Sequence, residues 1–202
     1  MARTIAKDYE QKRVHILKSA ARVFAEQGYD RASMSVLAKE CGISKANIYH
    51  YYDSKDALLF DVLDSYLKEL RNRICEIDLS GLDIKAQLRL VVREILLAYQ
   101  GADHEHRVQS TAMQALPEQQ QKVLRGYQRD LVNFVSEVVA ANGDGVFDTD
   151  PVRLRETTMS VFGMLNWYYM WQTGADADAR ERYADLATDL VLGGVHGLSI
   201  KP

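Results

Sequence analysis

Apolar residues recur at helical spacing along nearly the whole chain, and few residues interrupt that pattern. Only 3 prolines and 12 glycines occur among the 202 residues. The first helix is expected from about Asp8 to Gln27, with Gly28 as its stop. Its apolar face, spaced by three and four residues, consists of Val14, Leu17, Ala21 and Phe24. The pattern predicts an all-α protein with about nine helices.

Two short helices joined by a tight turn are expected next. One covers about Ser35–Glu40 with Ser35 as its N-cap, and the other covers about Lys45–Tyr51 with Ser44 as its N-cap. Gly42 supplies the positive φ that the turn needs. A small core against the first helix would be made by Leu37, Ala38, Ile43, Ile48 and Tyr52. This is the spacing of a helix-turn-helix, whose second helix lies in the major groove of DNA.

Longer helices fill the rest of the chain. The fourth is expected over about Lys55–Ile77, with Ser54 as its N-cap. Five more are expected at about Ile84–Gln100, His104–Ala115, Glu118–Asn142, Val152–Thr173 and Ala177–Leu198. The pattern changes near residue 55 without a flexible linker. We therefore expect a helix-turn-helix domain at residues 1–55 and a larger helical domain at residues 56–202.

The composition is that of a globular protein, with 47% apolar residues. No run of 18 apolar residues is present, so no membrane-spanning helix and no membrane partner are expected. The first residues lack the apolar segment of a secretory signal. Cys41 and Cys75 both fall in helical patterns, which favours two free thiols in a reducing compartment. We expect a cytoplasmic protein.

The net charge of −3 is unevenly distributed. Residues 1–55 carry 10 Lys and Arg against 6 Asp and Glu, whereas the rest of the chain carries 15 against 22. A basic head on an acidic body suggests that only the head meets a polyanion, although an asymmetry of this size is common by chance.

The helix over about Lys45–Tyr51 carries the candidate recognition surface. If Ile48 and Tyr52 face the core, the residues that face outward are Ser44, Lys45, Asn47, Tyr49, His50 and Tyr51. Lys45 and Lys55 offer charge to phosphates, and Ser44 with the free N–H groups of the helix start can hold a phosphate. Asn47 can read a base edge, and Tyr49 can contact a phosphate or a thymine methyl. Periodicity alone fits an ordinary helical hairpin with a solvated face equally well.

The order of residues favours DNA binding. The stretch ILKSAARVFAEQGYDRASMSVLAKECGISKANIYHYYDSKDALL closely resembles the N-terminal domain of the TetR family of bacterial transcriptional repressors, over roughly residues 10–60. The resemblance implies a three-helix DNA-binding head, a larger helical ligand-binding body and a homodimer. By position it places Lys45, Asn47, Tyr49, His50 and Tyr51 on the recognition helix, and Lys55 at the phosphate-contacting start of the fourth helix.

Two positions depart from the family pattern. Cys41 stands where the family often has alanine, and Tyr52 stands where it often has phenylalanine. Both residues are tolerable in a core, but the Tyr52 hydroxyl must find a partner there. Arg3 and Lys7 lie in a short N-terminal segment, Ala2 to Lys7, that either enters a minor groove or is simply disordered.

The last two helices are expected to form the dimer. The helix that contains Phe162, Leu165 and Tyr169 is apolar on much of its circumference, so it must be buried against more than its own domain. A second stripe on the last helix comprises Tyr183, Leu186, Ala187, Leu190, Val191 and Val195. An intramolecular core would account for part of both stripes. The resemblance implies that these helices form a four-helix interface with a second chain.

The residues Asn166, Trp167 and Trp171 are similar to a branch of the family whose effectors are acyl-CoA thioesters. An acyl chain needs an apolar tunnel, and a CoA head needs cations near its phosphates. Candidates for the tunnel are Met113, Tyr127, Phe134, Met164 and Trp167. Candidates for the head are Arg89, Arg93, Arg125 and Arg129. Side chains of these types are more often ordinary core or surface residues than ligand contacts.

No other chemistry is expected. His104 and His106 are two residues apart, so a helix points them to different sides, and no cysteine or carboxylate set completes a metal site. No phosphate-binding loop, nucleophile elbow or catalytic carboxylate pair is present in the sequence. We expect no metal, no cofactor and no enzyme activity.

The sequence thus predicts a homodimeric repressor that binds double-stranded operator DNA. A small hydrophobic effector, with an acyl-CoA as one candidate, would release it. Two alternatives remain open: a helical acyl-group binding protein or enzyme with a vestigial head, and an activator in place of a repressor.

Overall fold

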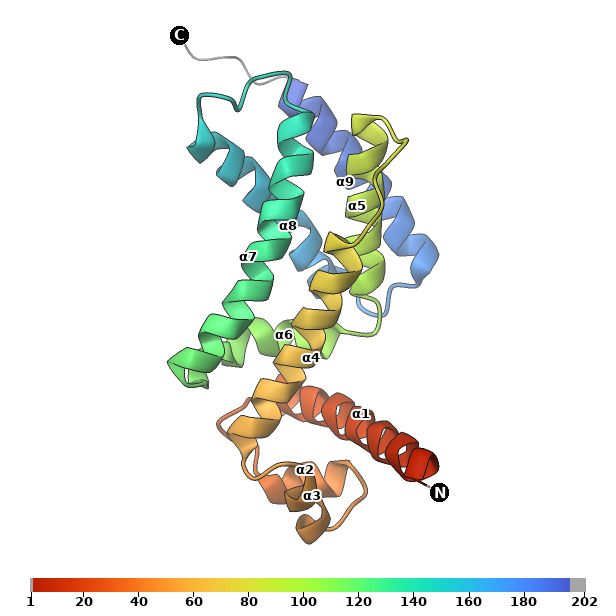
Figure 1. Ribbon diagram of the computed structural model, residues 1–202, viewed down its shortest axis with the longest axis vertical. Helices are drawn as coiled ribbons and strands as arrows, with labels where there is room; N and C mark the ends of the chain where they lie inside the picture. The colour runs from red at the N-terminus through yellow and green to blue at the C-terminus, as the bar shows by residue number, and fades with distance from the viewer. Residues whose placement is uncertain (1, 197–202) are drawn as a thin grey trace. The chain divides into compact units, whose positions relative to one another are not determined.

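The computed structural model describes residues 2–196, with side chains for residues 8–194. All regular elements in that part of the chain are helices, which confirms the predicted all-α fold (Figure 1). They are α1 (Ala2–Gln27), α2 (Met34–Glu40), α3 (Lys45–Tyr51), α4 (Lys55–Cys75), α5 (Ile84–Ala98), α6 (Asp103–Ala112), the short 3-10 helix η1 (Met113–Ala115), α7 (Glu118–Ala141), α8 (Pro151–Trp171) and α9 (Ala177–His196).

Three details of the sequence-based expectation were wrong. Helix α1 begins at Ala2, six residues before the predicted start. The N-cap of α2 is Ser33, whose Oγ accepts a hydrogen bond from the N–H of Val36 at 3.3 Å, so Ser35 is not the cap. Val14 is 53% exposed and does not belong to the buried face of α1. The face instead follows Ile16, Leu17, Ala20, Ala21 and Phe24, all of which are buried.

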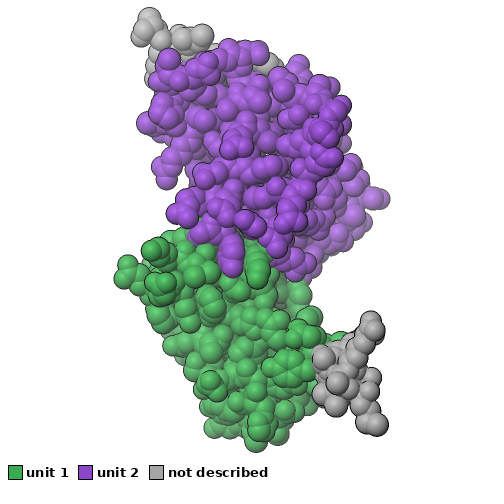
Figure 2. All heavy atoms as spheres, in the orientation of Figure 1, with its two compact units in different colours: residues 1–68, 102–125 green, residues 69–101, 126–202 purple. Residues whose placement is uncertain are grey.

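The chain forms two compact units, coloured separately in Figure 2. The first comprises residues 1–68 and 102–125, and the second comprises residues 69–101 and 126–202. The unit boundaries therefore fall inside α4, between α5 and α6, and inside α7, rather than at residue 55. The reason is that α6, far along the chain, packs against α1. A functional division into residues 1–55 and 56–202 stays a prediction.

The first unit is built around α1, which packs against α2 and α6, while α2 packs against α3. Its fully buried side chains include Phe24, Leu37, Ile48, Leu58 and Leu63. An ion pair between Lys18 Nζ and Glu105 Oε1, at 2.8 Å, ties α6 to α1. The Tyr66 hydroxyl and His106 Nδ1 lie 3.1 Å apart and tie α6 to α4. These contacts make α6 part of the same body as the helix-turn-helix.

The second unit is built around α5, which packs against α9 and α8. The buried face of α5 consists of Leu88, Val91, Val92, Ile95 and Leu96. Arg180, on α9, is only 1% exposed, and its guanidinium donates to the carbonyls of Ala175 and Leu96, each at 3.2 Å. Tyr99 donates to Asn166 Oδ1 at 2.7 Å and so joins the end of α5 to α8. Burial raises the pKa of Tyr99, so its hydroxyl stays a donor at neutral pH.

Candidate nucleic-acid interface

Helix α3 presents a polar surface around one buried anchor. Ile48 is fully buried and holds α3 against α2. Ser44 caps the helix as predicted, because its Oγ accepts a hydrogen bond from the N–H of Asn47 at 3.1 Å. The side chains of Lys45, Asn47, Tyr49 and His50 are exposed. A seven-residue helix with this arrangement has one face for its own core and the rest for solvent or a partner.

The turn before α3 has the geometry of a helix-turn-helix. Gly42 has φ of +67°, the left-handed region that glycine enters without steric strain. The preceding residue, Cys41, is buried, and both cysteines in the described chain are free thiols, with Cys75 half-buried. The close packing of α2 on α3 follows from this turn and from the small buried residue Ala38.

Tyr51, the last residue of α3, leans against α1. Its ring stacks on the ring of Tyr9, with centroids 4.9 Å apart and planes 19° from parallel. Tyr51 is half-buried as a result, whereas Tyr49 is 43% exposed. Sequence reasoning missed Tyr9, because the predicted first helix offered no reason to bring its start to α3. The stack places the N-terminal part of α1 beside the candidate recognition surface.

The hydroxyl of Tyr52 finds its partner on α4. It donates to Asp61 Oδ2 at 2.5 Å, and burial together with this hydrogen bond raises the pKa of Tyr52. Arg13, on α1, donates to both oxygens of the same carboxylate, at 3.0 Å from Nε and 2.5 Å from Nη2. Ser65 donates to Asp61 Oδ1 at 3.2 Å. One carboxylate therefore links α1, the end of α3 and α4.

This carboxylate could not have been assigned from the sequence. Asp61 and Ser65 share a helix face at a spacing of four residues, but Arg13 lies 48 positions away. The only signal was Tyr52 itself, since a buried tyrosine hydroxyl requires a hydrogen-bond partner.

Lys55 is held by the turn between α1 and α2. Its Nζ donates to the carbonyl of Tyr29 at 2.8 Å and lies 4.2 Å from the centre of the Tyr29 ring. The Tyr29 hydroxyl in turn donates to Asp56, and burial with this bond raises the pKa of Tyr29. Ser54 caps α4 as predicted, accepting from the N–H of Ala57 at 3.0 Å. The start of α4 is thus fixed to the head, and a phosphate contact by Lys55 stays a prediction.

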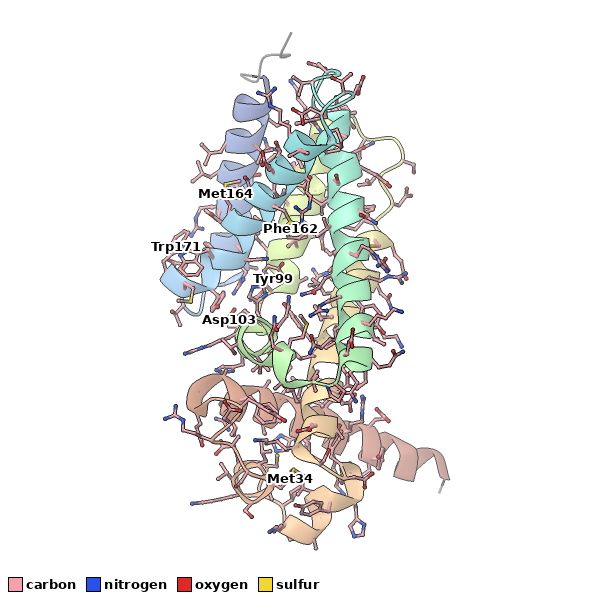
Figure 3. The ribbon with its side chains drawn as sticks, turned by 90° about the vertical axis from the view of Figure 1, so that its left-hand side faces the viewer. Met34, Tyr99, Asp103, Phe162, Met164 and Trp171 are labelled. Atoms are coloured by element: carbon pink, nitrogen blue, oxygen red, sulfur yellow. The ribbon has the colours of Figure 1, made fainter. Side chains whose placement is uncertain are left out.

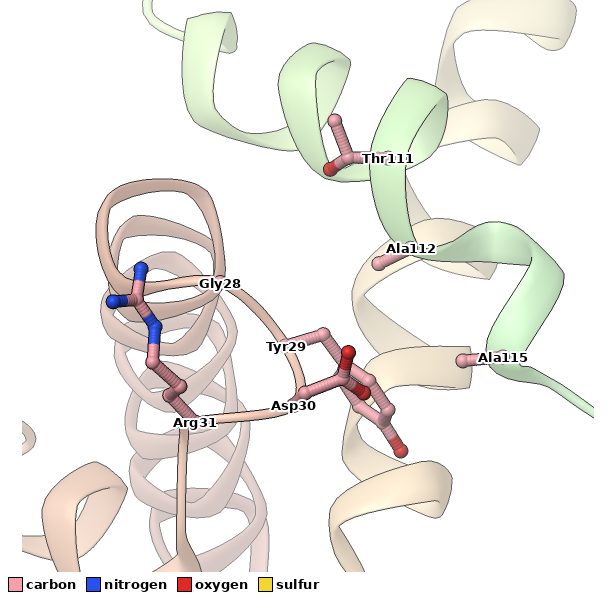
Figure 4. Close-up of a pocket in the computed structure, with 7 residues that line it drawn as sticks. All are labelled: Gly28, Tyr29, Asp30, Arg31, Thr111, Ala112 and Ala115. Carbon is pink, nitrogen blue, oxygen red and sulfur yellow. The ribbon is translucent and has the colours of Figure 1, made fainter.

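The same turn borders a hollow of about 380 Å³ in the first unit (Figure 4). Gly28, Tyr29, Asp30 and Arg31 form one side of it, and the other side is formed by Thr111, Ala112 and Ala115 from α6 and η1. Arg31 Nε donates to the carbonyl of Gln27 at 2.7 Å, so its charge folds back on the end of α1. The hollow separates the head's first turn from α6 but brings together none of the predicted site residues.

The predicted cations for an effector head are dispersed. Arg89 forms a double ion pair across to α9, with Asp185 at 2.8 Å and Asp189 at 2.6 Å. Arg93 lies 3.7 Å from Glu94, and Arg125 donates to Gln121 at 2.6 Å. Arg129 lines a groove between α7 and α8.

The predicted tunnel residues are also spread over several elements. Met113 lies in η1 of the first unit, and Tyr127 and Phe134 are half-buried on α7. Met164, labelled in Figure 3, lines a hollow of about 270 Å³ between α8 and α9 with Val161, Leu190 and Gly194. Trp167 is 61% exposed. An effector site made from these side chains stays a prediction.

An exposed apolar face runs along α8 and α9. Its large side chains are Trp167, Met170 and Trp171 on α8 and Leu186 and Leu190 on α9, each at least 51% exposed. Beneath it, Tyr168 and Tyr183 stack at 4.5 Å, and Trp171 (Figure 3) meets both rings edge-on. Burial raises the pKa values of both tyrosines. A rigid aromatic base under exposed apolar groups is typical of a surface that another chain covers.

The two histidines near residue 105 lie in different surroundings. His106 is buried beside Tyr66, whereas His104 is exposed and lies 3.7 Å from Glu26. No group of three His, Cys, Asp or Glu side chains in the described residues is placed to hold a metal ion. The side chains of Arg3 and Lys7 lie outside the described part, so the N-terminal arm stays a prediction. None of the helices described has the length and hydropathy that a membrane span needs.

Comparisons with known proteins agree with this architecture. Residues 16–62 match the family described as bacterial regulatory proteins, tetR family, and residues 81–195 match the tetracyclin repressor-like C-terminal domain. The HTH-type transcriptional repressor KstR2 of Rhodococcus jostii (strain RHA1) is 33% identical over 95 residues. That stretch is 47% of this chain and 45% of KstR2, so the match spans less than half of that relative.

Solved structures extend the likeness to almost the whole chain. A TetR-family transcriptional regulator from Bordetella parapertussis 12822 has a TM-score of 0.81 and 31% identity, covering 93% of this chain and 97% of that one. AibR, solved with isovaleryl coenzyme A and operator DNA, has a TM-score of 0.73 and 22% identity, over 89% and 97% of the two chains. At that identity AibR supports the fold alone. The two family matches and the Bordetella structure show that this chain belongs to the TetR family of bacterial regulatory proteins.

Proposed function

We propose that the protein is a homodimeric transcriptional repressor that binds operator DNA through α3. The observation that carries this proposal is the surface of α3, where Lys45, Asn47, Tyr49 and His50 are exposed around the single buried anchor Ile48. Amide, phenol and imidazole groups on a short helix are the groups that read base edges and phosphates. Family membership supports the same assignment.

In this proposal the two ends of α3 have different roles. The N-terminus, with Ser44 and Lys45, contacts phosphate, because the free N–H groups and the lysine both favour an anion. Asn47, Tyr49 and His50 face the bases and the adjacent backbone. Tyr51 supports this surface from the side by its stack on Tyr9.

The dimer proposed here uses the apolar face of α8 and α9. Covering Trp167, Leu186 and Leu190 with a second copy removes large apolar side chains from water. A two-fold axis then presents two α3 helices to successive major grooves, about 34–36 Å apart.

A small effector would control this binding. AibR was solved in complex with isovaleryl coenzyme A and operator DNA, and a second fold neighbour is the ketosteroid transcriptional regulator KstR2 of Mycobacterium tuberculosis. These relatives and the Asn166, Trp167, Trp171 pattern support an acyl-CoA as the effector to test first. Release requires differential affinity, and a preference of about 100-fold for the non-binding state corresponds to about 2.7 kcal/mol of coupling per site.

Asp61 would carry the effector's influence to the DNA. Its carboxylate joins α4 to Arg13 and to Tyr52 at the end of α3. A shift of α4 must either move α3 with it or break these hydrogen bonds. The second candidate function, an acyl-group binding protein or enzyme with a vestigial head, is not favoured, because the relatives matched are regulators.

The experiment that tests the proposal is native mass spectrometry of the purified protein, followed by a gel shift with the DNA upstream of its own gene. We expect a dimer that shifts this DNA, and we expect the co-purified small molecule, or isovaleryl-CoA added in its place, to abolish the shift. A dimer that shifts DNA but does not respond to acyl-CoA thioesters would support the repressor function and exclude acyl-CoA thioesters as the effector. Failure of the protein to shift the upstream DNA would contradict the proposed repressor function.

A further inference from the structure

A solvent-open groove of about 420 Å³ lies between α7 and α8 in the second unit. This volume falls within the range of small-molecule sites, about 300–1,000 Å³. The groove is lined by one face of each helix, so its walls are regular elements rather than loops. Rigid walls matter because they hold polar groups in place before a ligand arrives.

The α7 wall is mostly polar. Arg129, Val132, Asn133 and Ser136 follow the i, i+3, i+4, i+7 spacing of one helix face. Only Val132 among them is apolar. Two helices pack closely when apolar faces meet. This face of α7 is mostly polar, so it does not pack closely against α8 in that way.

The α8 wall supplies the apolar floor. Leu154 and Met159 line it together with the buried Thr158, whose hydroxyl donates to the carbonyl of Leu154 at 2.9 Å. That hydroxyl is satisfied inside the helix, so it needs no ligand. With Val132 opposite, the floor offers apolar surface to a ligand that has a hydrocarbon part.

Two arginines line the groove, Arg129 from α7 and Arg155 from α8. Among the described residues neither forms an ion pair, and no acidic side chain lines the groove. Other arginines of the same unit are paired: Arg71 with Asp130, Arg73 with Glu94, and Arg89 with Asp185 and Asp189. Two cations with no acidic side chain beside them therefore lie over an apolar floor in this groove.

We propose that this groove binds a small amphiphilic organic anion, with its carboxylate or phosphate on Arg129 and Arg155 and its hydrocarbon part on Leu154, Met159 and Val132. Guanidiniums suit both anions, because their planar N–H groups match the oxygens in pairs. Asn133 and Ser136 provide further hydrogen-bonding groups at the rim. This inference rests on the proposed function in one respect, since it names the class of effector and its docking groups.

The binding test uses the purified full chain in its native oligomeric state and contains no DNA. Isothermal titration calorimetry measures the affinity for sodium octanoate, octyl phosphate and the uncharged 1-octanol. The variants are Arg129→Gln and Arg155→Gln, and Arg107→Gln is the matched control, because Arg107 is an exposed arginine on α6 outside the groove.

We expect at least one of the two anions to bind saturably and more tightly than 1-octanol. Each groove substitution should weaken the binding of that anion by about tenfold, the effect of about 1.4 kcal/mol, while Arg107→Gln should leave the affinity unchanged. Preference for octanoate or for octyl phosphate then tells whether the natural ligand presents a carboxylate or a phosphate. Equal affinity for the anions and 1-octanol, or anion binding that both groove variants retain, would overturn the proposal.

A gel shift separates this inference from the proposed function. In the variant with both Arg129→Gln and Arg155→Gln, we expect operator DNA to be bound normally but isovaleryl-CoA to release it only at a higher concentration than from the unmodified protein. Normal release in this double variant would place the effector elsewhere and reject the groove, while leaving the repressor intact. If the unmodified protein does not bind operator DNA, the proposed function is rejected instead. The calorimetric test of the groove is independent of that outcome.

Discussion

Adjacent tyrosines at the end of α3 have separate tasks. Tyr51 stacks on Tyr9 of α1, and Tyr52 donates its hydroxyl to Asp61 of α4. The alternation follows from the end of the helix, because Tyr52 is the C-cap and already has extended backbone. The sequence predicted that Tyr52 is a core residue in need of a partner, but the identity of that partner depended on folding.

Replacing Tyr49 tests the assignment of the recognition surface. Tyr49→Ala removes an exposed ring from α3, so it should weaken operator binding by about tenfold and leave the fold and the oligomeric state unchanged. Val123→Ala, an exposed position on α7, serves as the control. Gel-shift titration measures both, and an unchanged affinity for Tyr49→Ala would remove this residue from the interface.

Replacing Tyr52 tests the link to Asp61. Tyr52→Phe keeps the ring but deletes a hydrogen bond to a largely buried carboxylate, so the free energy of unfolding should fall by about 1–2 kcal/mol. Because the folded-state pKa of Tyr52 is raised, the hydroxyl is protonated at neutral pH and its contribution is lost only in alkaline solution.

Urea denaturation at neutral pH provides the measurement for this substitution. Tyr49→Phe is the matched control, because its hydroxyl is exposed and its loss should change the free energy of unfolding by less than about 0.5 kcal/mol. Equal free energies of unfolding for Tyr52→Phe and the unmodified protein would mean that the hydrogen bond to Asp61 is no stronger than the hydrogen bonds that the hydroxyl makes to water in the unfolded chain.

At the scale of elements, periodicity located each α-helix of the described chain, and local chemistry set most of the ends. The 3-10 helix η1 was not distinguished from the helix predicted over His104–Ala115. Ser44 and Ser54 cap α3 and α4 as predicted, because a cap depends only on the next three residues. The start of α1 was missed, since the segment Ala2–Lys7 has no sustained apolar period. The placement of α6 against α1 was missed as well, because that contact joins residues far apart in the chain.

The residues of the candidate site also fall into those that local sequence predicts and those that depend on contacts between helices. The exposed residues of α3 were predicted from the sequence, because one buried position at helical spacing determines which neighbours face outward. Tyr9, Arg13 and Asp61 were not, since their contacts cross from one helix to another. The groove residue Arg155 gave no signal either, because nothing in the sequence shows that its neighbours lack a carboxylate.

The cap of α2 offers a direct test of the corrected helix boundary. Ser33→Ala removes the acceptor for the N–H of Val36, so it should lower the free energy of unfolding by about 1 kcal/mol. Ser35→Ala should change it little, because Ser35 lies inside the first turn and makes no cap bond. Thermal or urea unfolding of the two variants distinguishes them, and a larger loss for Ser35→Ala would restore the boundary that the sequence predicted.

At the scale of the whole molecule, α4 is a single helix whose residues belong to both compact units. Its first part carries Asp61 and its last part carries Arg71 and Arg73, which pair with Asp130 and Glu94. In the proposed function, these ion pairs and hydrogen bonds make α4 the element through which an effector in the body would act on α3. In the same proposal, the exposed apolar face of α8 and α9 is the surface that a partner chain would cover.

A charge placed in that apolar face should prevent assembly. Leu190→Glu puts a carboxylate where we propose a buried contact, so the dimer dissociation constant should rise by at least about 30-fold. Val123→Glu, an equally drastic change at an exposed position of α7, should leave the dimer intact. Sedimentation velocity measures both, and an unaffected Leu190→Glu dimer would move the interface away from α9.

Sequence-specific DNA binding by α3, on which the proposed function depends, can be tested by fluorescence anisotropy. The unmodified protein is titrated into labelled DNA from upstream of its own gene and into a shuffled sequence of equal length, over a series of salt concentrations. We predict tighter binding to the upstream DNA, with the logarithm of the affinity falling linearly with the logarithm of the salt concentration. Equal affinity for the two sequences at every salt concentration, or no binding to either, would contradict the proposed function.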